Sequence, residues 1–225
     1  MPDSSDTIDS INAEIVSCRR CPRLVAWREE VALEKRASFR DWEYWGRPVP
    51  GFGDPEARLL VVGLAPAAHG GNRTGRVFTG DSSGDWLYGS LHRTGFASQP
   101  HSTHREDGLV LRDAYVSAAV RCAPPANKPS VDERDACQPF LEREIGALTG
   151  LQVIVPLGAF AYEAVCRVLG VRPRPRFGHL AEAAPTTGPL VVCSYHPSQH
   201  NTFTGRLTAS MLDAVFTRAR EVIGS

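Results

Sequence analysis

The sequence has no excess of charge of either sign and no long apolar run. Its 25 basic and 25 acidic residues give a formal net charge of zero, so overall charge gives no reason to expect binding to nucleic acid or membranes, and any electrostatic footprint must be local. No apolar segment is long enough to span a bilayer. The acidic, polar start of the chain does not resemble a signal peptide. We therefore expect a cytoplasmic protein.

The glycine-rich fingerprints of nucleotide-binding proteins are also missing. The loop of residues 63–81 follows the apolar run Leu59–Val62. It contains no lysine and matches neither G-x-G-x-x-G nor G-x-x-x-x-G-K-[ST]. Neither ATP, magnesium nor a nicotinamide cofactor is therefore expected. The loop combines small residues with side chains suited to lining a pocket: His69, Arg73, Arg76, Phe78 and Asp81.

Composition and apolar pattern predict an α/β fold. The 225 residues are 42% hydrophobic and 22% charged, typical of a globular protein with one sizeable core. Short apolar runs alternate with helical patterns, which indicates right-handed crossovers and a parallel sheet covered on both faces. We expect residues 1–10 to form a flexible tail and residues 11–225 a single domain. The expected strands begin at Leu59 and span residues 114–120, 152–157 and 190–195.

Helix signals separate these strands. Asp6 or Asp9 can cap a first helix that ends at the first cysteine pair. Ser130 and Glu133 have the spacing of a capping box. Further helices are expected after Ser82 or Ser83 and over residues 159–169 and 207–223.

Six cysteines in a chain without an export signal favour metal binding, reactivity or burial over disulfide bonds. Cys18 and Cys21 form a C-x-x-C pair, and Cys122 and Cys137 flank a proline-rich loop. Two such pairs can form a four-thiolate site, but their spacing does not distinguish zinc from iron–sulfur. The other two lie in apolar patterns and are expected to be small buried hydrophobes: Cys166 and Cys193.

A second loop, residues 194–208, follows the last expected strand. Ligands of parallel sheets bind just beyond the carboxyl ends of the strands. This loop and the loop of residues 63–81 can therefore converge on one cleft. His196, followed by Pro197, is well placed there to reach a substrate.

Three motifs and the cysteine pattern together resemble the family 5 (UDGb-type) branch of the uracil-DNA glycosylase superfamily. The motifs are GLAPAAH…NRTGR…FTGD, RCAPPANKP and HPSQHNTFTGRLT, and the similarity extends from Cys18 to Thr208. The resemblance implies a three-layer α/β/α fold with a central four-stranded parallel sheet. It also implies a monomeric, monofunctional DNA repair glycosylase that removes uracil and other deaminated bases. A [4Fe-4S] cluster is implied on Cys18, Cys21, Cys122 and Cys137.

The resemblance also implies roles for individual residues. A base must leave the duplex stack and enter a pocket before its glycosidic bond can be cut. Phe78 would stack on that base, and the amide of Asn127 would hydrogen-bond its edge. His196 would donate to the base oxygen where negative charge develops. Asp81 would orient the attacking water.

Ordinary structural roles remain open for these positions. Phe78 can be a core residue beneath the loop, and Asn127 can belong to a plain turn. Asp81, with Ser82, can simply cap the next helix, in which case catalysis would depend mainly on electrostatic stabilisation.

The pocket is expected to be roomy. Relatives with a G-Q-D-P-Y-H motif have an aspartate where this chain has Ala65, and a tyrosine that excludes the thymine methyl where it has Ala67. Gly63 and Ala67 are therefore assigned to the base pocket. We expect a range that includes hypoxanthine and larger cytosine adducts.

DNA contacts are assigned to four residues on the two loops: Arg73, Arg76, Asn201 and Arg206. Each arginine can instead be a solvated surface charge. With no net charge, the affinity for DNA should be modest and sensitive to salt. Two other functions stay open: a glycosylase specific for hypoxanthine or adducts, and a non-catalytic nucleic-acid-binding module with a four-cysteine metal staple.

Overall fold

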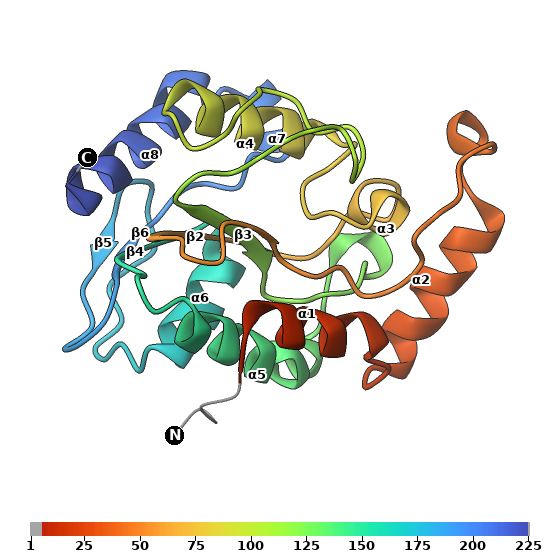
Figure 1. The fold of residues 1–225 in the computed structure, drawn as a ribbon, viewed down its shortest axis with the longest axis horizontal. Coiled ribbons are helices and arrows are strands. Elements are labelled where there is room, and N and C mark those ends of the chain that lie inside the picture. Colours follow the sequence, from red (N-terminus) through yellow and green to blue (C-terminus); the bar gives the residue numbers. More distant parts are fainter. Residues whose placement is uncertain (1–5, 225) are drawn as a thin grey trace.

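Four parallel strands form the centre of a six-stranded sheet in the computed structural model, which describes residues 6–224 (Figure 1). The strand order is β1-β3-β2-β4-β6-β5, with β1 and β5 added antiparallel at the two edges. The four predicted strands and the α/β/α class are confirmed. The edge strands, two residues each, are too short to show a periodic pattern in the sequence. The strands are β1 (Phe52–Gly53), β2 (Leu59–Gly63), β3 (Ala114–Ala118), β4 (Val153–Pro156), β5 (Glu182–Ala183) and β6 (Leu190–Val192).

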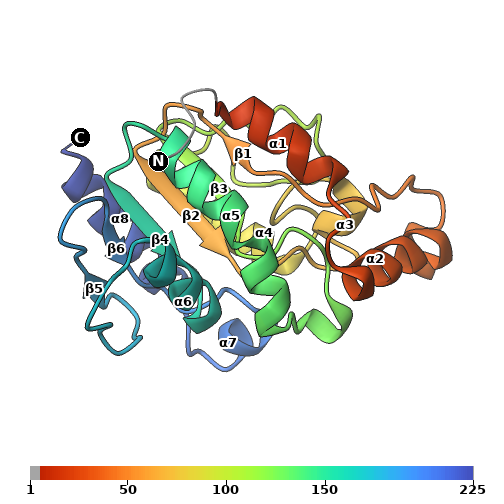
Figure 2. The ribbon, with the colours of Figure 1, turned by 90° about the horizontal axis from the view of Figure 1, so that it is seen from below.

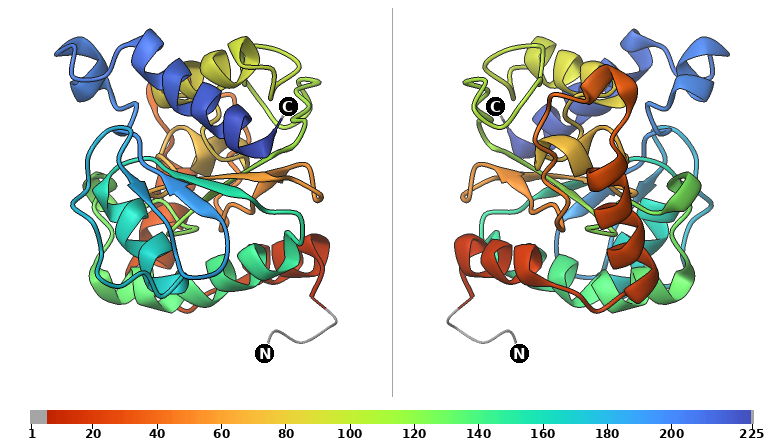
Figure 3. Two further views of the ribbon diagram at one scale, coloured as in Figure 1. Left: turned by 90° about the vertical axis from the view of Figure 1, so that its left-hand side faces the viewer. Right: turned by 90° about the vertical axis from the view of Figure 1, so that its right-hand side faces the viewer.

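The central strand β2 is buried on both faces. Leu59 and Val61 belong to one apolar cluster, whereas Leu60 and Val62 belong to the other. This alternation is what a strand imposes on successive side chains. A strand with two apolar faces needs cover on both sides, and Figure 3 shows the sheet between two helical layers.

The two layers are made by different helices. Helices α4 and α8 pack together on one face, and α1, α5 and α6 cover the other (Figures 1 and 2). Among the described residues, no helix is long and apolar enough to cross a membrane. The helices are α1 (Ile8–Ser17), α2 (Pro22–Glu34), α3 (Gly71–Thr74), α4 (Ser82–Arg93), α5 (Val131–Ala147), α6 (Ala159–Val168), α7 (Gln199–Phe203) and α8 (Ala209–Ile223), with short 3-10 turns η1 (Ala37–Phe39) and η2 (Pro125–Asn127).

The start of the chain differs from the prediction. Residues 1–5 of the expected tail lie outside the described residues, but Ile8–Ser10 are already helical. Thr7, not Asp6 or Asp9, caps α1, because its hydroxyl accepts from the backbone N–H of Ser10. Asp6 instead forms an ion pair with Arg143 of α5, at 2.6 Å. The capping box predicted for α5 at Ser130 is confirmed.

Candidate active site

A pocket of about 770 Å³ opens beyond the carboxyl ends of the parallel strands. Most of its wall comes from the loop after β2 and from the loop after β6, which therefore converge as predicted. Arg36 and Phe39, from the segment after α2, complete the rim. The predicted base-pocket and catalytic residues that line the pocket are Ala67, Phe78, Asp81, Asn127 and His196.

Phe78 is held in a conformation that favours glycine. Its φ of 51° lies in the left-handed region, which a bulky side chain adopts only where the surroundings enforce it. Its ring lies against the end of β2, where a Cβ atom on Gly63 would come within 2.6 Å of the ring. A Cβ atom on Gly84 would meet the Phe78 carbonyl oxygen at 1.9 Å. Gly63 thus serves the pocket by making room for Phe78.

His196 follows β6 and is fixed by its backbone. The side-chain amide of Asn201 donates to the His196 carbonyl oxygen at 2.8 Å. Gly158, the N-cap residue of α6, lets the backbone approach His196 closely, because a Cβ atom on Gly158 would lie 3.3 Å from the Cβ of His196. Burial lowers the pKa of His196 to about 4, so the imidazole is neutral near pH 7. Asn201, predicted to contact DNA, positions this histidine.

Asp81 is both a helix cap and part of the pocket wall. Its Oδ1 accepts from the backbone N–H of Gly84 at 3.1 Å at the start of α4. Its Oδ2 lies beside Gly70, where a Cβ would come within 2.2 Å. Burial raises the pKa of the Asp81 carboxyl, and the N–H groups of Gly84 and Ser83 oppose that rise. The two predicted roles are therefore compatible, because Oδ1 accepts the capping bond from Gly84 whereas Oδ2 lies beside Gly70.

Arg73 does not present a free charge to DNA. The residue is 4% exposed, and its Nε donates to the His69 carbonyl at 2.8 Å. Its guanidinium carbon lies 3.9 Å from the ring centre of Phe39 and 4.1 Å from that of Trp42. Cation–π contacts of this kind attach the segment after α2 to the pocket loop.

Arg76 is buried as well, at 3% exposure. It forms an ion pair with Asp107 at 2.6 Å. The placement of Arg73 and Arg76 therefore corrects the prediction that both contact phosphates. Arg206 is exposed, and its guanidinium covers the ring of Tyr195 at 4.7 Å.

The four paired cysteines line one small pocket on the far side of the loop after β2: Cys18, Cys21, Cys122 and Cys137. Arg28, 2% exposed, donates from Nη1 to the Cys122 sulfur at 2.9 Å. Its buried Nε has no hydrogen-bond partner among the described residues. Within residues 6–224, no three or more His, Cys, Asp or Glu side chains form a group that could hold a metal ion. Ala65 packs against this cysteine pocket and also lines the larger pocket.

The remaining cysteines behave as predicted. Cys166 of α6 and Cys193, just after β6, are both buried in the core cluster beneath the sheet.

Some residues at the site carry no signal in the sequence. Phe203, at the end of α7 in the loop after β6, is 84% exposed. Arg36 and Phe39 reach the pocket from a segment that precedes the motif loop by many residues. Only folding brings Arg36 and Phe39 to the pocket. The residue type of Phe203 does not reveal whether its side chain is exposed or buried.

Known proteins match this chain over most of its length. A family model described as "Uracil DNA glycosylase superfamily" matches residues 50–220. The "Type-5 uracil-DNA glycosylase" of Mycobacterium leprae is 52% identical over 221 residues, covering 97% of this chain and 96% of the relative. Its namesake in Thermus thermophilus is 52% identical over 211 residues, 93% and 95% of the two chains. That of Pyrobaculum aerophilum is 46% identical over 212 residues, 94% and 91%.

Proposed function

The chain belongs to the uracil DNA glycosylase superfamily, and from this membership we propose how its pocket removes uracil from DNA. The reaction hydrolyses the bond between the base and C1′ of the sugar and leaves an abasic site. The observation that carries the proposal is the meeting of Phe78, Asp81 and His196 in one pocket built from two distant loops. An aromatic face, a carboxylate and a buried imidazole are the groups that this reaction needs.

Entry of the base comes first. A base inside a duplex is out of reach, so the nucleotide must swing out of the stack into the pocket. The ring of Phe78, fixed against Gly63, offers one face for stacking. Asn127 lines the same pocket, and its amide can donate to and accept from the edge of the base.

His196 then stabilises the leaving base. As the bond to C1′ breaks, its electron pair moves onto the base, which becomes an anion. A neutral imidazole can donate its N–H to the base oxygen where this charge collects. Because the donor is held by the contact of Asn201 with the His196 carbonyl, it needs no reorganisation at the moment of reaction.

Asp81 orients the water that attacks C1′. The water oxygen bonds to C1′ as the bond to the base breaks, and the carboxylate takes the released proton. Burial, which raises the pKa of Asp81, makes this carboxylate a better base than an exposed one. Its Oδ2 is the atom available for this task, since Oδ1 caps α4.

The substrate range extends beyond uracil in this proposal. The wall between Leu64 and Ala68 consists of small side chains, with Ala67 facing the base. Hypoxanthine and larger cytosine adducts should fit. Excision should therefore be measured across a panel of such bases, and strict confinement to uracil would contradict this part of the proposal. Activity on hypoxanthine or adducts without uracil would favour the specific glycosylase instead.

Arg206 and Phe203 hold the DNA in this proposal. Arg206 is exposed in the loop after β6 and can contact a phosphate. Phe203, 84% exposed, can enter the space that the base vacates, as apolar wedges do in other proteins that distort DNA. The enzyme would act as a cytoplasmic monomer.

The cysteine pocket fits an iron–sulfur cluster better than it fits an empty core. The buried guanidinium of Arg28 donates to the Cys122 sulfur at 2.9 Å and to the Cys18 carbonyl oxygen at 3.3 Å, and the Glu29 carboxylate lies 3.8 Å away. A buried cation is stabilised by negative charge in direct contact, which thiolates at this pocket would supply. Four thiolates are the ligand set of a [4Fe-4S] cluster, in which they bind separate irons, so they need not converge as ligands of one ion do. We propose that Cys18, Cys21, Cys122 and Cys137 hold such a cluster. When bound, it would crosslink the turn between α1 and α2 to the region around α5.

The decisive experiment uses duplex DNA with a single deoxyuridine, scored for alkali-labile cleavage. His196→Ala should lower the single-turnover rate by about 10²- to 10³-fold, as loss of a donor to a developing anion does elsewhere. Asp81→Asn should lower it to a comparable degree. The matched controls are His92→Ala and Asp85→Asn, which change exposed residues of α4.

Each result has a definite meaning. Wild-type activity lost in both variants and kept in both controls supports the assigned roles. Activity retained by Asp81→Asn would reduce this residue to a helix cap. A wild type that cleaves none of the panel would favour the non-catalytic binding module.

A further inference from the structure

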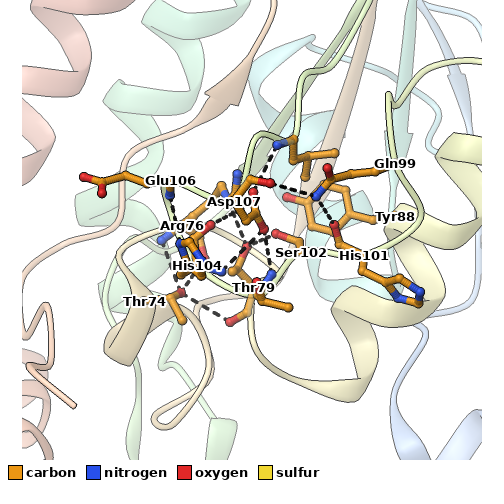
Figure 4. Close-up of polar contacts among 12 residues, drawn as sticks. Thr74, Arg76, Thr79, Tyr88, Gln99, His101, Ser102, His104, Glu106 and Asp107 are labelled. Carbon is orange, nitrogen blue, oxygen red and sulfur yellow. Dashed lines mark hydrogen bonds and ion pairs between the residues drawn. The ribbon is translucent and has the colours of Figure 1, made fainter.

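We infer that the segment of residues 101–109 is a positioning element for Phe78 and Asp81, joined to them through the buried pair Arg76–Asp107. The inference rests on the function proposed above and adds to it a part of the chain outside the pocket. None of residues 101–109 lines the pocket. The segment instead contacts residues 76–80 through an ion pair and hydrogen bonds, among them those of Arg76 and Thr79 (Figure 4).

The ion pair is the centre of this contact. The side chains of Arg76 and Asp107 are 3% and 6% exposed, with 2.6 Å between Nη2 and Oδ1. Asp107 also organises its own segment, because Oδ2 accepts from the N–H of Thr103 at 2.7 Å and Oδ1 accepts from that of Leu109 at 3.1 Å. Arg76 also donates to the carbonyl oxygen of His104. One carboxylate thus folds the segment and attaches it to the pocket loop.

A second group of contacts reaches the residues between Phe78 and Asp81. The hydroxyl oxygens of Thr79 and Ser102 lie 2.6 Å apart. The N–H of Gly80 donates to the Ser102 carbonyl at 3.1 Å. Thr79 is also tied to Arg76, whose Nε donates to its hydroxyl oxygen at 3.2 Å.

These contacts explain how Phe78 keeps its conformation. A left-handed φ at a bulky residue is unfavourable and persists only where neighbouring contacts over-determine it. The residues on both sides of Phe78 are fixed: Tyr88 donates to the Val77 carbonyl at 2.9 Å, and Thr79 is held as described. Released from the 101–109 segment, the loop would relax, which would move the stacking ring and the carboxylate together.

The test compares Asp107→Asn with Glu106→Gln, the same chemical change on the exposed neighbouring side chain. In single-turnover excision of uracil, Asp107→Asn should lower the rate constant by about 10- to 100-fold, the cost of a small misplacement of reacting groups. Affinity for the abasic product should stay unchanged. The amplitude of the single-turnover reaction reports the fraction of enzyme that is folded. If the role of Asp107 were merely structural, Asp107→Asn would lower this amplitude and leave the rate constant of the active fraction at the wild-type value.

A second variant keeps the test decisive if Asp107→Asn does not fold. Ser102→Ala removes only the hydroxyl contact with Thr79 and should lower the rate constant in the same direction. The inference would be overturned if the rate constant of Asp107→Asn equalled that of Glu106→Gln. If Asp107→Asn does not fold, the same comparison is made with Ser102→Ala. A wild type without activity would instead overturn the proposed function, so the two failures are distinguishable.

Discussion

The ring of Phe78 and the imidazole of His196 lie 6.0 Å apart between centres, with 35° between their planes. They come from loops that leave β2 and β6 at the same edge of the sheet. A base stacked on Phe78 would present its edge to His196. In the mechanism proposed above, this aromatic surface would set where the base sits and this neutral donor would receive its negative charge.

Because His196 is buried, the free energy of unfolding should decrease in acid. Because the pKa of His196 is lowered from 6.5 to about 4 in the folded chain, only the unfolded chain takes up this proton between those values. The free energy of unfolding should therefore fall as the pH drops from about 6.5 to about 4, by up to about 3 kcal/mol from this residue. Urea denaturation of wild type and His196→Gln across this range measures it. His92→Gln, at an exposed position, should retain the wild-type slope; equal slopes in all three proteins would contradict the assignment.

Gly63 should tolerate no side chain. Gly63→Ala places a Cβ within 2.6 Å of the Phe78 ring, so the ring must move out of its stacking position. We expect an overpacking cost of about 1–3 kcal/mol and slower excision of every base that the wild type accepts. Gly150→Ala is the control, since its Cβ would meet its nearest neighbour at an ordinary 3.6 Å. Wild-type excision by Gly63→Ala would show that Phe78 does not stack on the base.

Phe203 should be needed for excision from duplex DNA but not for excision from single-stranded DNA. Phe203→Ala removes an 84% exposed side chain that would fill the vacated stack, whereas single-stranded DNA has no stack to fill. We expect slower excision from duplex and unchanged excision from single strands, measured under single-turnover conditions. Leu33→Ala changes another exposed apolar residue, at 82% exposure, and should affect neither. An equal loss on both substrates would argue against a wedge.

Arg28 should be needed for loading of the cysteine pocket. Its guanidinium is the buried cation that faces the Cys122 sulfur, and Arg28→Gln leaves the negative charge of thiolate ligands without it. The purified variant should contain less iron and show weaker broad visible absorption than the wild type. Arg19→Gln, which removes an exposed guanidinium paired with Glu29, should load normally. Full iron content in Arg28→Gln would contradict this role, and a colourless wild type that contains zinc would contradict the cluster itself.

Some of this fold is readable from the sequence because the signal is local. The run Leu59–Val62 is long and apolar enough to indicate a strand buried on both faces, and Ser130 with Glu133 carries its own capping geometry. The sequence does not single out Thr7 as the cap, because Asp6 and Asp9 are also good caps by residue type. In the structure Thr7 forms a reciprocal capping box with Ser10, and Asp6 is instead paired with the distant Arg143.

The roles of the two loop arginines depend on contacts that no local pattern reveals. Arg73 lies in a loop rich in small residues, where a charge ordinarily reaches solvent, yet Phe39 and Trp42 enclose it. Arg76 is paired with Asp107, which lies in a polar segment of the sequence, residues 101–108. A charged residue is expected at the surface unless a buried partner is known. The partners of Arg73 and Arg76 are distant in the sequence.

The bracing of residues 76–80 by the 101–109 segment has a consequence for how lesions are found. A loop with so many tertiary contacts has little freedom to close over a base. Entry of the base should therefore depend mainly on how readily the DNA base pair opens. Base pairs that open with little energy should then be processed faster than stable ones. Uracil opposite guanine, a mismatch, should be released sooner than uracil opposite adenine, although the pocket receives the same base from both.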